Sequence, residues 1–246
     1  MIVLIDEYDA PLNHAFRRGY YKEASAFFRK FYSSALKQDG ESSLEKACLM
    51  GIVEVRGAGI LSGLNNIKVY CSSDEKYSSS FGFLSQEIER YVGGELDNVI
   101  DWYNGYKFGS ATVINPWYFM NYLSSCKLSN YWVGSSYMET LSVVFNPHTK
   151  TVITAVIDLI CCDSIDVTPL TTQVNYTTSN WDLNSILHFL VHKGYLTYQE
   201  NPTTQTHQVP IPNKELQDHW KTEFIPLAKS FMEDLDPLLP ARIRTC

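Results

Sequence analysis

The feature that most constrains the fold is the N-terminal run Met1–Ile5, which is apolar and is followed at once by Asp6 and Glu7. A continuous run rich in Ile and Val is typical of a parallel strand covered on both faces. Acidic residues at the carboxyl end of such a strand face the crevice in which open α/β sheets bind ligands. The sequence therefore predicts a central strand, with Asp6 and Glu7 as the first candidates for a functional site.

The next residues predict a helix and a second strand. After Pro11, apolar residues recur at three- and four-residue steps, which predicts an amphipathic helix that packs on the sheet. Its stripe consists of Tyr20, Ala24, Phe27, Phe28, Phe31 and Ala35. Cys48–Val55 is a second apolar run that predicts a buried strand. The order strand, helix, strand indicates an α/β sheet.

The rest of the chain predicts mainly helices and one β-hairpin. Helices are predicted over Ser85–Tyr91, Asp97–Trp102, Leu183–Lys193 and Lys214–Asp234, and strands over Tyr195–Gln199 and Gln208–Ile211. The order helix, hairpin, helix is that of a winged-helix-like unit. We expect three segments, namely a partial α/β core in residues 1–70, a helical and aromatic lid-like region in 71–165, and a winged-helix-like subdomain in 166–246.

Composition excludes several classes of function. Asp plus Glu is 27 against 20 for Lys plus Arg, a net charge of -7, so the chain lacks the broad basic footprint of a nucleic-acid binder. The apolar run Thr151–Cys162 is shorter than the ~20 residues that span a membrane. No signal peptide is expected, since Met1–Ile5 has no basic region before it.

The cysteines and histidines do not predict a metal site or a covalent hydrolase. No CxxC pair occurs, and His188 and His192 lack the Glu of an HExxH zinc site. Adjacent Cys161 and Cys162 lie in an apolar run and are expected to be buried thiols. This use of cysteine suits a reducing compartment, so we expect an intracellular, cytoplasmic protein.

A longer phrase around the acid pair resembles a known family. Leu4–Leu12, with the sequence LIDEYDAPL, resembles the AAA-ATPase-like family, P-loop NTPases that are often joined to PD-(D/E)XK nuclease domains. Further phrases resemble the same family in the same order. They are Leu61–Asn66, Phe81–Phe83, Trp102–Tyr106 with Asn115–Trp117, Tyr131–Trp132, Gly194–Thr197 and Ile211–Asn213. The resemblance therefore extends over most of the chain.

The resemblance implies an ATP and Mg²⁺ site. Asp6, as the Walker B acid, would hold the Mg²⁺ that bridges the phosphates, and Glu7 would orient the attacking water. Four further residues are candidates for contact with the cofactor, namely Asp9, Arg56, Asn65 and Asn66. Asn65 and Asn66 follow Gly63, where an Asn pair also favours a turn. Arg56 would replace a basic residue that the family carries earlier on this strand.

The sequence departs from the family in its phosphate-binding parts. No GxxxxGK[ST] loop occurs, and only five residues precede Asp6, so a truncated chain that lacks Walker A is expected. Met50 and Glu54 stand where the family tends to have a Thr and a basic residue. Methionine cannot hydrogen-bond a phosphate as a hydroxyl does, and a carboxylate repels it. Asn104 stands where the family more often has Asp.

Three functions follow from these observations. The first is a degenerate AAA-ATPase-like module that does not hydrolyse ATP alone and acts in regulation or protein interaction, with a protein partner or self-association. The second is a fragment of an active ATPase whose P-loop is missing from this chain. The third is a nucleic-acid-binding winged-helix module, which the single Lys193 between Asn184 and Ile211 disfavours.

An aromatic cluster in the middle region has two interpretations. Its members are Trp102, Tyr103, Tyr106, Phe108, Trp117 and Tyr118. Aromatic side chains can stack on bases, but a base-stacking site is normally accompanied by several cations. Lys107 is the basic residue among them. We therefore predict that the cluster packs in the protein interior.

Overall fold

The computed structural model describes residues 1–37, 44–52, 54–56, 64, 66–132, 149–162, 164–171, 173–175, 182–201 and 203–226, and gives the backbone alone at 17, 54–56, 149–150, 162 and 173–175. The chain divides into two compact units. Unit 1 comprises residues 1–69 and 171–181, and unit 2 comprises residues 70–170 and 182–246. The fold is mixed α/β, with sheets of two or three strands among the described residues.

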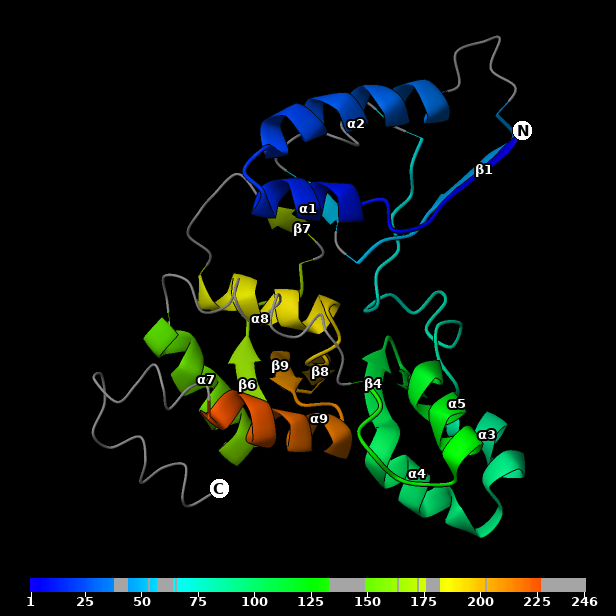
Figure 1. The fold of residues 1–246 in the computed structure, drawn as a ribbon, viewed down its shortest axis with the longest axis vertical. Helices are drawn as coiled ribbons and strands as arrows, with labels where there is room; N and C mark the ends of the chain where they lie inside the picture. The colour runs from blue at the N-terminus through cyan, green and yellow to red at the C-terminus, as the bar shows by residue number, and fades with distance from the viewer. Residues whose placement is uncertain are drawn as a thin grey trace. The chain divides into compact units, whose positions relative to one another are not determined.

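Unit 1 is built from parallel strand pairs and two helices (Figure 1). Strands β1 (Ile2–Ile5) and β2 (Lys46–Leu49) are parallel, with Ile2 opposite Lys46 and Ile5 opposite Leu49. Helices α1 (Ala10–Arg17) and α2 (Tyr21–Leu36) come between these strands in sequence. The two helices pack side by side. A second parallel pair joins β3 (Glu54–Arg56) to β7 (Gln173–Asn175).

The prediction that the first strand is covered on both faces is wrong for the described residues. Within them, β1 pairs with β2 alone, and the side chain of Leu4 is 75% exposed. The predicted face of α2 is also wrong, because Phe27 and Phe31 are 62% and 50% exposed. The helix instead buries Ser25, Tyr32 and Leu36. Unit 1 thus leaves apolar side chains of both elements exposed to solvent.

The predicted strand over Cys48–Val55 is two strands separated by a break near Gly51. A Cβ atom at Gly51 would lie 2.5 Å from Oδ1 of Asp9 and 2.6 Å from the ring of Tyr8. Only glycine therefore allows the backbone to pass this close to the residues after β1. The break lets β3 leave the β1–β2 pair and join β7.

The first part of unit 2 contains three α-helices and a β-hairpin. In chain order these are α3 (Ser85–Val92), the 3₁₀ turn η1 (Gly93–Glu95), α4 (Leu96–Tyr103), β4 (Asn104–Phe108), β5 (Ala111–Ile114) and α5 (Pro116–Ser125). The two helices predicted over Ser85–Tyr91 and Asp97–Trp102 are confirmed within a residue at each end. Asn115 caps α5, because its side-chain oxygen accepts the backbone N–H of Trp117.

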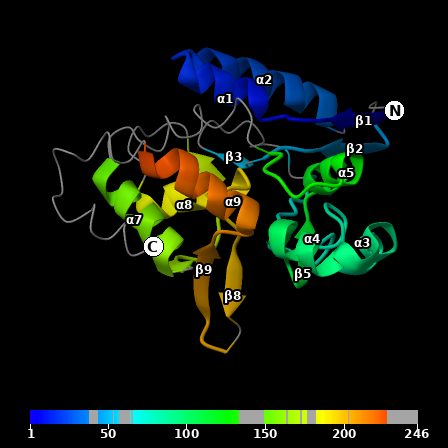
Figure 2. The same ribbon diagram turned by 60° about the horizontal axis from the view of Figure 1, so that its bottom comes forward.

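The second part of unit 2 contains a three-stranded antiparallel sheet in the order β6-β9-β8. Its elements are α7 (Thr149–Cys162), β6 (Ser164–Val167), α8 (Leu183–His192), β8 (Gln199–Asn201), β9 (Thr206–Pro210), α9 (Lys214–His219) and the π-helix η2 (Trp220–Phe224). Figure 2 shows the β8–β9 hairpin projecting from the helices. The predicted order helix, hairpin, helix is confirmed. The winged-helix assignment stays a prediction.

The predicted boundaries of the hairpin and of the last helix differ from those observed. The first strand begins at Gln199 and not at Tyr195, because the backbone N–H groups of Tyr195 and Leu196 donate to the carbonyl of Leu190 and close the turn after α8. The second strand is Thr206–Pro210. The closing helix changes from α to π geometry at Trp220, and its predicted end lies outside the described residues.

Phrases far apart in sequence meet in the core of unit 2. Gly105, at φ +131, lies against Pro212, whose carbonyl oxygen would be 1.7 Å from a Cβ atom at this position. The backbone N–H of Lys107 donates to Oγ1 of Thr197 at 2.8 Å. The hydroxyl of Tyr106 donates to the Gly194 carbonyl at 3.0 Å. Three segments that are distant in sequence therefore pack against one another, namely Trp102–Tyr106, Gly194–Thr197 and Ile211–Asn213.

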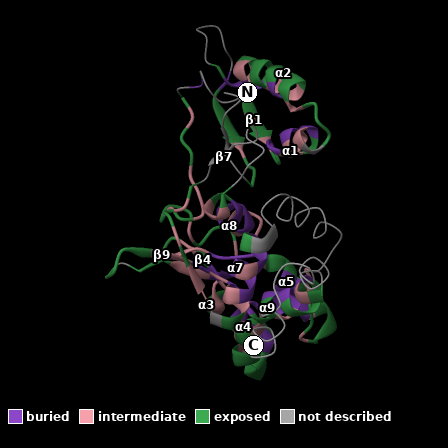
Figure 3. Cartoon of the chain, turned by 90° about the vertical axis from the view of Figure 1, so that its left-hand side faces the viewer, coloured by how far each residue is buried: buried purple, intermediate pink, exposed green. Residues whose placement is uncertain are grey.

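The aromatic cluster is mostly interior, as predicted. Tyr103, Tyr106 and Tyr118 are buried, and the hydroxyls of Tyr106 and Tyr118 lie 3.0 Å apart. Burial raises the pKa of Tyr103 to about 12 and raises the pKa of Tyr106 and Tyr118 as well. Trp102 and Phe108 are half-buried, and Trp117 is exposed. Figure 3 shows buried residues concentrated in the helices of unit 2.

The cysteines differ from the expected pattern at one position. Cys161, at the end of α7, is exposed and disulfide-bonded, so the prediction of a buried thiol there is wrong. Cys48, Cys71 and Cys126 are free. Among the helices that the structure describes, none combines the length and the apolar character needed to cross a membrane.

Candidate functional site

The acid pair lies where β1 and β2 end side by side. The backbone N–H of Met50 donates to the carbonyl of Ile5 at 2.8 Å, and the N–H of Tyr8 donates to the carbonyl of Met50 at 3.0 Å. These bonds extend the pairing just past the carboxyl ends of both strands. Asp6 and Glu7 fall between them and are exposed. The two carboxylates therefore occupy the edge where a parallel sheet binds ligands.

The backbone at Glu7 has a conformation that is rare for its residue type. Its φ is 51°, in the left-handed region, which most residues other than Gly, Asn and Asp avoid. Oδ1 of Asp6 accepts the Glu7 N–H at 2.8 Å, and the Glu7 carbonyl accepts the Ala10 N–H at 3.0 Å. Such backbone strain tends to be retained at functional sites.

The buried side chain of Asp9 fixes the turn that follows β1. It is 1% exposed, and its Oδ1 atom accepts the backbone N–H of Ile52 at 3.2 Å. Its Oδ2 atom accepts Nδ2 of Asn13 at 3.1 Å. A buried carboxylate with both oxygens bonded to protein groups positions the backbone that it binds. Contact between Asp9 and a nucleotide stays a prediction.

Tyr32 and Gly51 were not predicted as site residues. The buried hydroxyl of Tyr32 donates to the Tyr8 carbonyl at 2.9 Å and so joins α2 to the turn. Burial, and then the charge of Asp9, raises the pKa of Tyr32, which keeps the hydroxyl a hydrogen-bond donor. Gly51 leaves the space that Asp9 and Tyr8 fill. An apolar stripe cannot reveal a hydrogen bond of this kind, although Tyr among Phe residues is a weak signal of one.

The other predicted cofactor residues are not brought to the acid pair. Nδ2 of Asn66 donates to the carbonyl of Leu36 at 3.0 Å, which satisfies the last residue of α2. Asn65 lies outside the described residues. Arg56 belongs to β3, which pairs with β7 in a separate sheet, and only its backbone is described. Their roles in cofactor binding stay predictions.

The N-terminal sequence matches one family of proteins. Residues 1–61 match the AAA-ATPase-like family, whose description is "Predicted AAA-ATPase". This segment is similar to that family. The match takes in β1, the acid pair, α1, α2 and β2, so it contains the whole site described above. The family indicates nucleotide binding in general.

The chain also matches part of a longer bacterial protein. Over 138 residues the chain is 29% identical to the "Uncharacterized protein in vnfD 5'region" of Azotobacter chroococcum mcd 1. The match takes in 54% of this chain and 26% of that protein, so the chain spans about a quarter of the length of this curated relative. No solved structure shows a significant match.

The AAA-ATPase-like acid pair fits part of a magnesium site. Mg²⁺ in nucleotide sites is usually held by one or two carboxylates, by waters and by phosphate oxygens. Exposed Asp6 could supply one such ligand, although its Oδ1 atom already accepts the Glu7 N–H. No cluster of three or more His, Cys, Asp or Glu side chains suited to a metal ion occurs among the described residues. A metal here would therefore depend on the phosphates for most of its ligands.

Replacing Asp9 with alanine is expected to destabilise unit 1 by about 2 kcal/mol, because the Ile52 N–H and the Asn13 amide each lose a partly buried acceptor. Chemical denaturation measures the loss, and faster hydrogen exchange at the Ile52 amide locates it. The matched control is Glu45→Ala, which removes an exposed carboxylate next to β2 and should change stability by less than about 0.5 kcal/mol. Unchanged exchange at Ile52 would contradict this role for Asp9.

Proposed function

We propose that this chain is an AAA-ATPase-like protein that acts as a regulatory or protein-interaction module and does not hydrolyse ATP by itself. The observation that carries the proposal is the exposure of β1, the strand that presents the acid pair. Its Leu4 side chain is 75% exposed, and Ile2 is exposed on the same face. Apolar strands of this composition are normally covered, so the proposal assigns this surface to contact with another polypeptide segment.

The phosphate-binding chemistry supports the second half of the proposal. The sequence of 246 residues contains no GxxxxGK[ST] loop, which in P-loop proteins supplies the backbone N–H groups and the lysine that bind the phosphates. At the end of β2, next to the acid pair, Met50 offers a thioether and not a hydroxyl. The carboxylates of Asp6 and Glu7 repel a triphosphate. We therefore expect weak nucleotide affinity and no turnover by these residues alone.

The test is Mg-ATP binding and hydrolysis by the purified chain beside an Asp6→Ala, Glu7→Ala double variant. We expect neither protein to release phosphate faster than the protein-free control. The reason is that the acid pair alone does not hold the triphosphate in position for attack by water. Isothermal titration measures affinity, and phosphate release measures turnover. Both acids are exposed, so the double variant should keep its fold.

The comparison between the two proteins decides the outcome. Hydrolysis by the natural chain that disappears in the double variant would refute the proposal. Hydrolysis that persists in the double variant does not depend on the acid pair. Such activity would indicate a contaminating ATPase, and further purification should remove it from both proteins. The control Glu200→Ala alters an exposed carboxylate of unit 2 and should behave as the natural chain does.

One observation favours a second function, the ATP-hydrolysing one. Glu7 keeps a left-handed backbone that costs roughly 1–3 kcal/mol, and the turn holds both acids at the sheet edge. A functional ATPase would have a reason to retain this strain. In that case a GxxxxGK[ST] loop supplied by other residues would complete the site. Turnover gained by adding such a polypeptide and lost with Glu7→Ala would establish this function.

A nucleic-acid-binding function is the least supported of the three. In the segment from Asn184 to Ile211, Lys193 is the one Lys or Arg, and its ammonium lies 5.6 Å from the centre of the Phe189 ring. Phosphate anchoring normally needs several cations. Salt-sensitive binding of DNA at micromolar protein would establish this function.

A further inference from the structure

Unit 2 has an open groove between the ends of two helices. Its volume is about 520 Å³, and it is lined by Tyr91, Val92, Glu95, Tyr122, Leu123, Cys126 and Leu128. This volume is within the range of roughly 300–1,000 Å³ that binding pockets occupy. The lining is mostly apolar, with Glu95 as its single charged side chain. Tyr91 is exposed at the edge, and Met120 and Trp117 on α5 are further exposed apolar residues.

The electrostatics of this groove favour a cation. Val92 is the last residue of α3, and Cys126 caps the end of α5 in the left-handed conformation, so both helices direct their carboxyl ends toward the lining. A helix carries a partial negative charge at that end. Exposed acids on the neighbouring turns outnumber the bases, with Glu87, Glu89, Glu95 and Asp97 against Arg90 and Lys127. The groove therefore suits an apolar group that carries a positive charge.

The outer face of α2 has the complementary character. Phe27 and Phe31 are exposed and stacked, with ring centres 6.3 Å apart and an angle of 12° between the rings. Exposed Lys30 lies on the same side of the helix, between the two rings in sequence. Figure 3 shows exposed residues along α2. An amphipathic helix that presents apolar residues at such spacing is a common occupant of a groove.

We infer that the groove of unit 2 binds the Phe27, Lys30 and Phe31 face of α2 from a second copy of this chain. The two aromatic rings would cover the apolar lining, and the ammonium of Lys30 would lie near Glu95 and the two helix ends. The contact joins different surfaces of the two copies, so in a pair one copy keeps its helix face free and the other keeps its groove free for further association. This inference rests on the proposed interaction role and names its partner.

The test is sedimentation velocity of the full chain over a range of micromolar concentrations. The natural chain is expected to associate reversibly, so its mean mass rises with concentration. Phe27→Ser with Phe31→Ser should weaken association at least ~10-fold, since exposed aromatic anchors carry most of the affinity of such contacts. These residues are exposed, so folding should be kept, which circular dichroism verifies.

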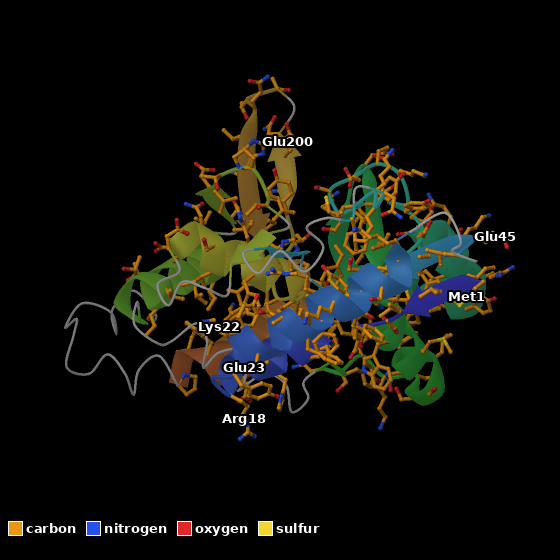
Figure 4. All side chains as sticks on the ribbon, turned by 90° about the horizontal axis from the view of Figure 1, so that it is seen from above. Met1, Arg18, Lys22, Glu23, Glu45 and Glu200 are labelled. Carbon is orange, nitrogen blue, oxygen red and sulfur yellow. The ribbon has the colours of Figure 1, made fainter. Side chains whose placement is uncertain are left out.

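A charge exchange tests the pairing of surfaces directly. Lys30→Glu and Glu95→Lys should each weaken association, and a mixture of the two variants should associate more strongly than either does alone. Lys22→Glu is the matched control, because Lys22 lies about two and a half turns before Phe31 and so points to the opposite side of α2 (Figure 4). It should associate as the natural chain does.

Three results would overturn the inference. The first is a natural chain that stays monomeric at every concentration. The second is association that the Phe27→Ser, Phe31→Ser variant leaves unchanged. The third is a sedimentation coefficient that differs between the natural chain and this variant by the same amount at every concentration. A difference of that kind would mean that the contact forms within one chain. ATP turnover measured on the same preparation tests the proposed lack of hydrolysis separately, so either conclusion can fail alone.

Discussion

Gly105→Ala is expected to destabilise unit 2 by at least about 3 kcal/mol. A Cβ atom at this position would lie 1.7 Å from the carbonyl oxygen of Pro212, and the φ of +131° is one that alanine rarely adopts. The clash is with backbone, so no side-chain rotation relieves it. Gly105 also lies where the β4–β5 register shifts, so the strain would spread into that hairpin. Thermal or urea denaturation of the full chain measures the loss.

The matched control for this prediction is Gly94→Ala. Gly94 belongs to η1 in the same unit, and a Cβ atom there meets no heavy atom within 4 Å. The free energy of unfolding should change by less than about 1 kcal/mol in Gly94→Ala, because this substitution alters only the conformational entropy of the backbone. Equal losses from the two substitutions would show that Gly105 is not held against Pro212 in solution.

Glu215→Gln is expected to stabilise unit 2 by about 3 kcal/mol at pH 8 and to have little effect at pH 4. Glu215 is 0% exposed, and burial raises its pKa from 4.5 to about 7, although the backbone N–H groups of Trp132 and Tyr131 favour its charged form. Its Oε1 atom accepts the Trp132 N–H at 2.7 Å, and Oε2 has no hydrogen-bond partner among the described atoms. Glutamine keeps the acceptor and removes the charge.

The direction of the pH effect follows from proton binding. Between pH 4.5 and about 7 the folded protein holds a proton on Glu215 that the unfolded chain has released. The free energy of unfolding therefore falls as pH rises through this window, and the full cost remains above it. His188 and His219 act in the opposite direction, since burial lowers their pKa and folding stability is lost as pH falls.

The measurement is the difference in free energy of unfolding between the natural chain and Glu215→Gln, taken from pH 4 to pH 8. The difference cancels the histidines, which both proteins share. Glu200→Gln is the control, because Glu200 is exposed on the β8–β9 hairpin and its replacement should leave the pH profile as it is (Figure 4). A Glu215→Gln profile parallel to that of the natural chain would contradict a buried carboxyl at this position.

Four helices of unit 2, namely α3, α4, α8 and α9, could be predicted because their sequence signals are local, whereas α5 and α7 were not predicted. Ser85–Val92 begins where the Glu87 carboxylate accepts the backbone N–H of Leu84, and α8 begins where Asp182 caps the N–H of Ser185. Both bonds join residues three apart, so they form in the same way whatever surrounds the helix. The apolar periodicity then fixes which residues face the core. Asn115, in the phrase before Trp117, is a signal of the same kind.

The orientation of α2 could not be predicted from its periodicity. Phe27, Phe28, Phe31 and Tyr32 together extend over ~140° of the circumference of the helix, so the apolar pattern allows more than one buried face. The face is selected by Tyr32, whose hydroxyl reaches the carbonyl of Tyr8, 24 residues away in sequence. A contact at that separation depends on how β1 and α2 pack, which no window of neighbouring residues contains.

At the candidate site, residue types were easier to predict than their roles. Asp6 and Glu7 were identified because acids after an apolar strand reach the edge of a sheet, and the structure places them there. Asp9 carries the same carboxylate but is turned inward to the N–H of Ile52, which is 43 residues away. The left-handed backbone at Glu7 depends on the same packing. Sequence thus indicates the chemistry of the edge, while tertiary contacts decide which acid is exposed.

The pairing of β3 with β7 has a consequence for synthesis of the chain. Residues 54–56 find their partner strand at residues 173–175, and all of the intervening residues from 70 to 170 belong to the other unit. A ribosome must therefore make most of the polypeptide before the N-terminal unit can close, and contacts between such distant residues form slowly. A chain ended at Leu170 would leave β3 without β7, and the Gly105 backbone would lack Pro212. Both units are therefore completed late in translation, unit 1 once residues 171–181 are made and unit 2 only after residues 182–246 follow.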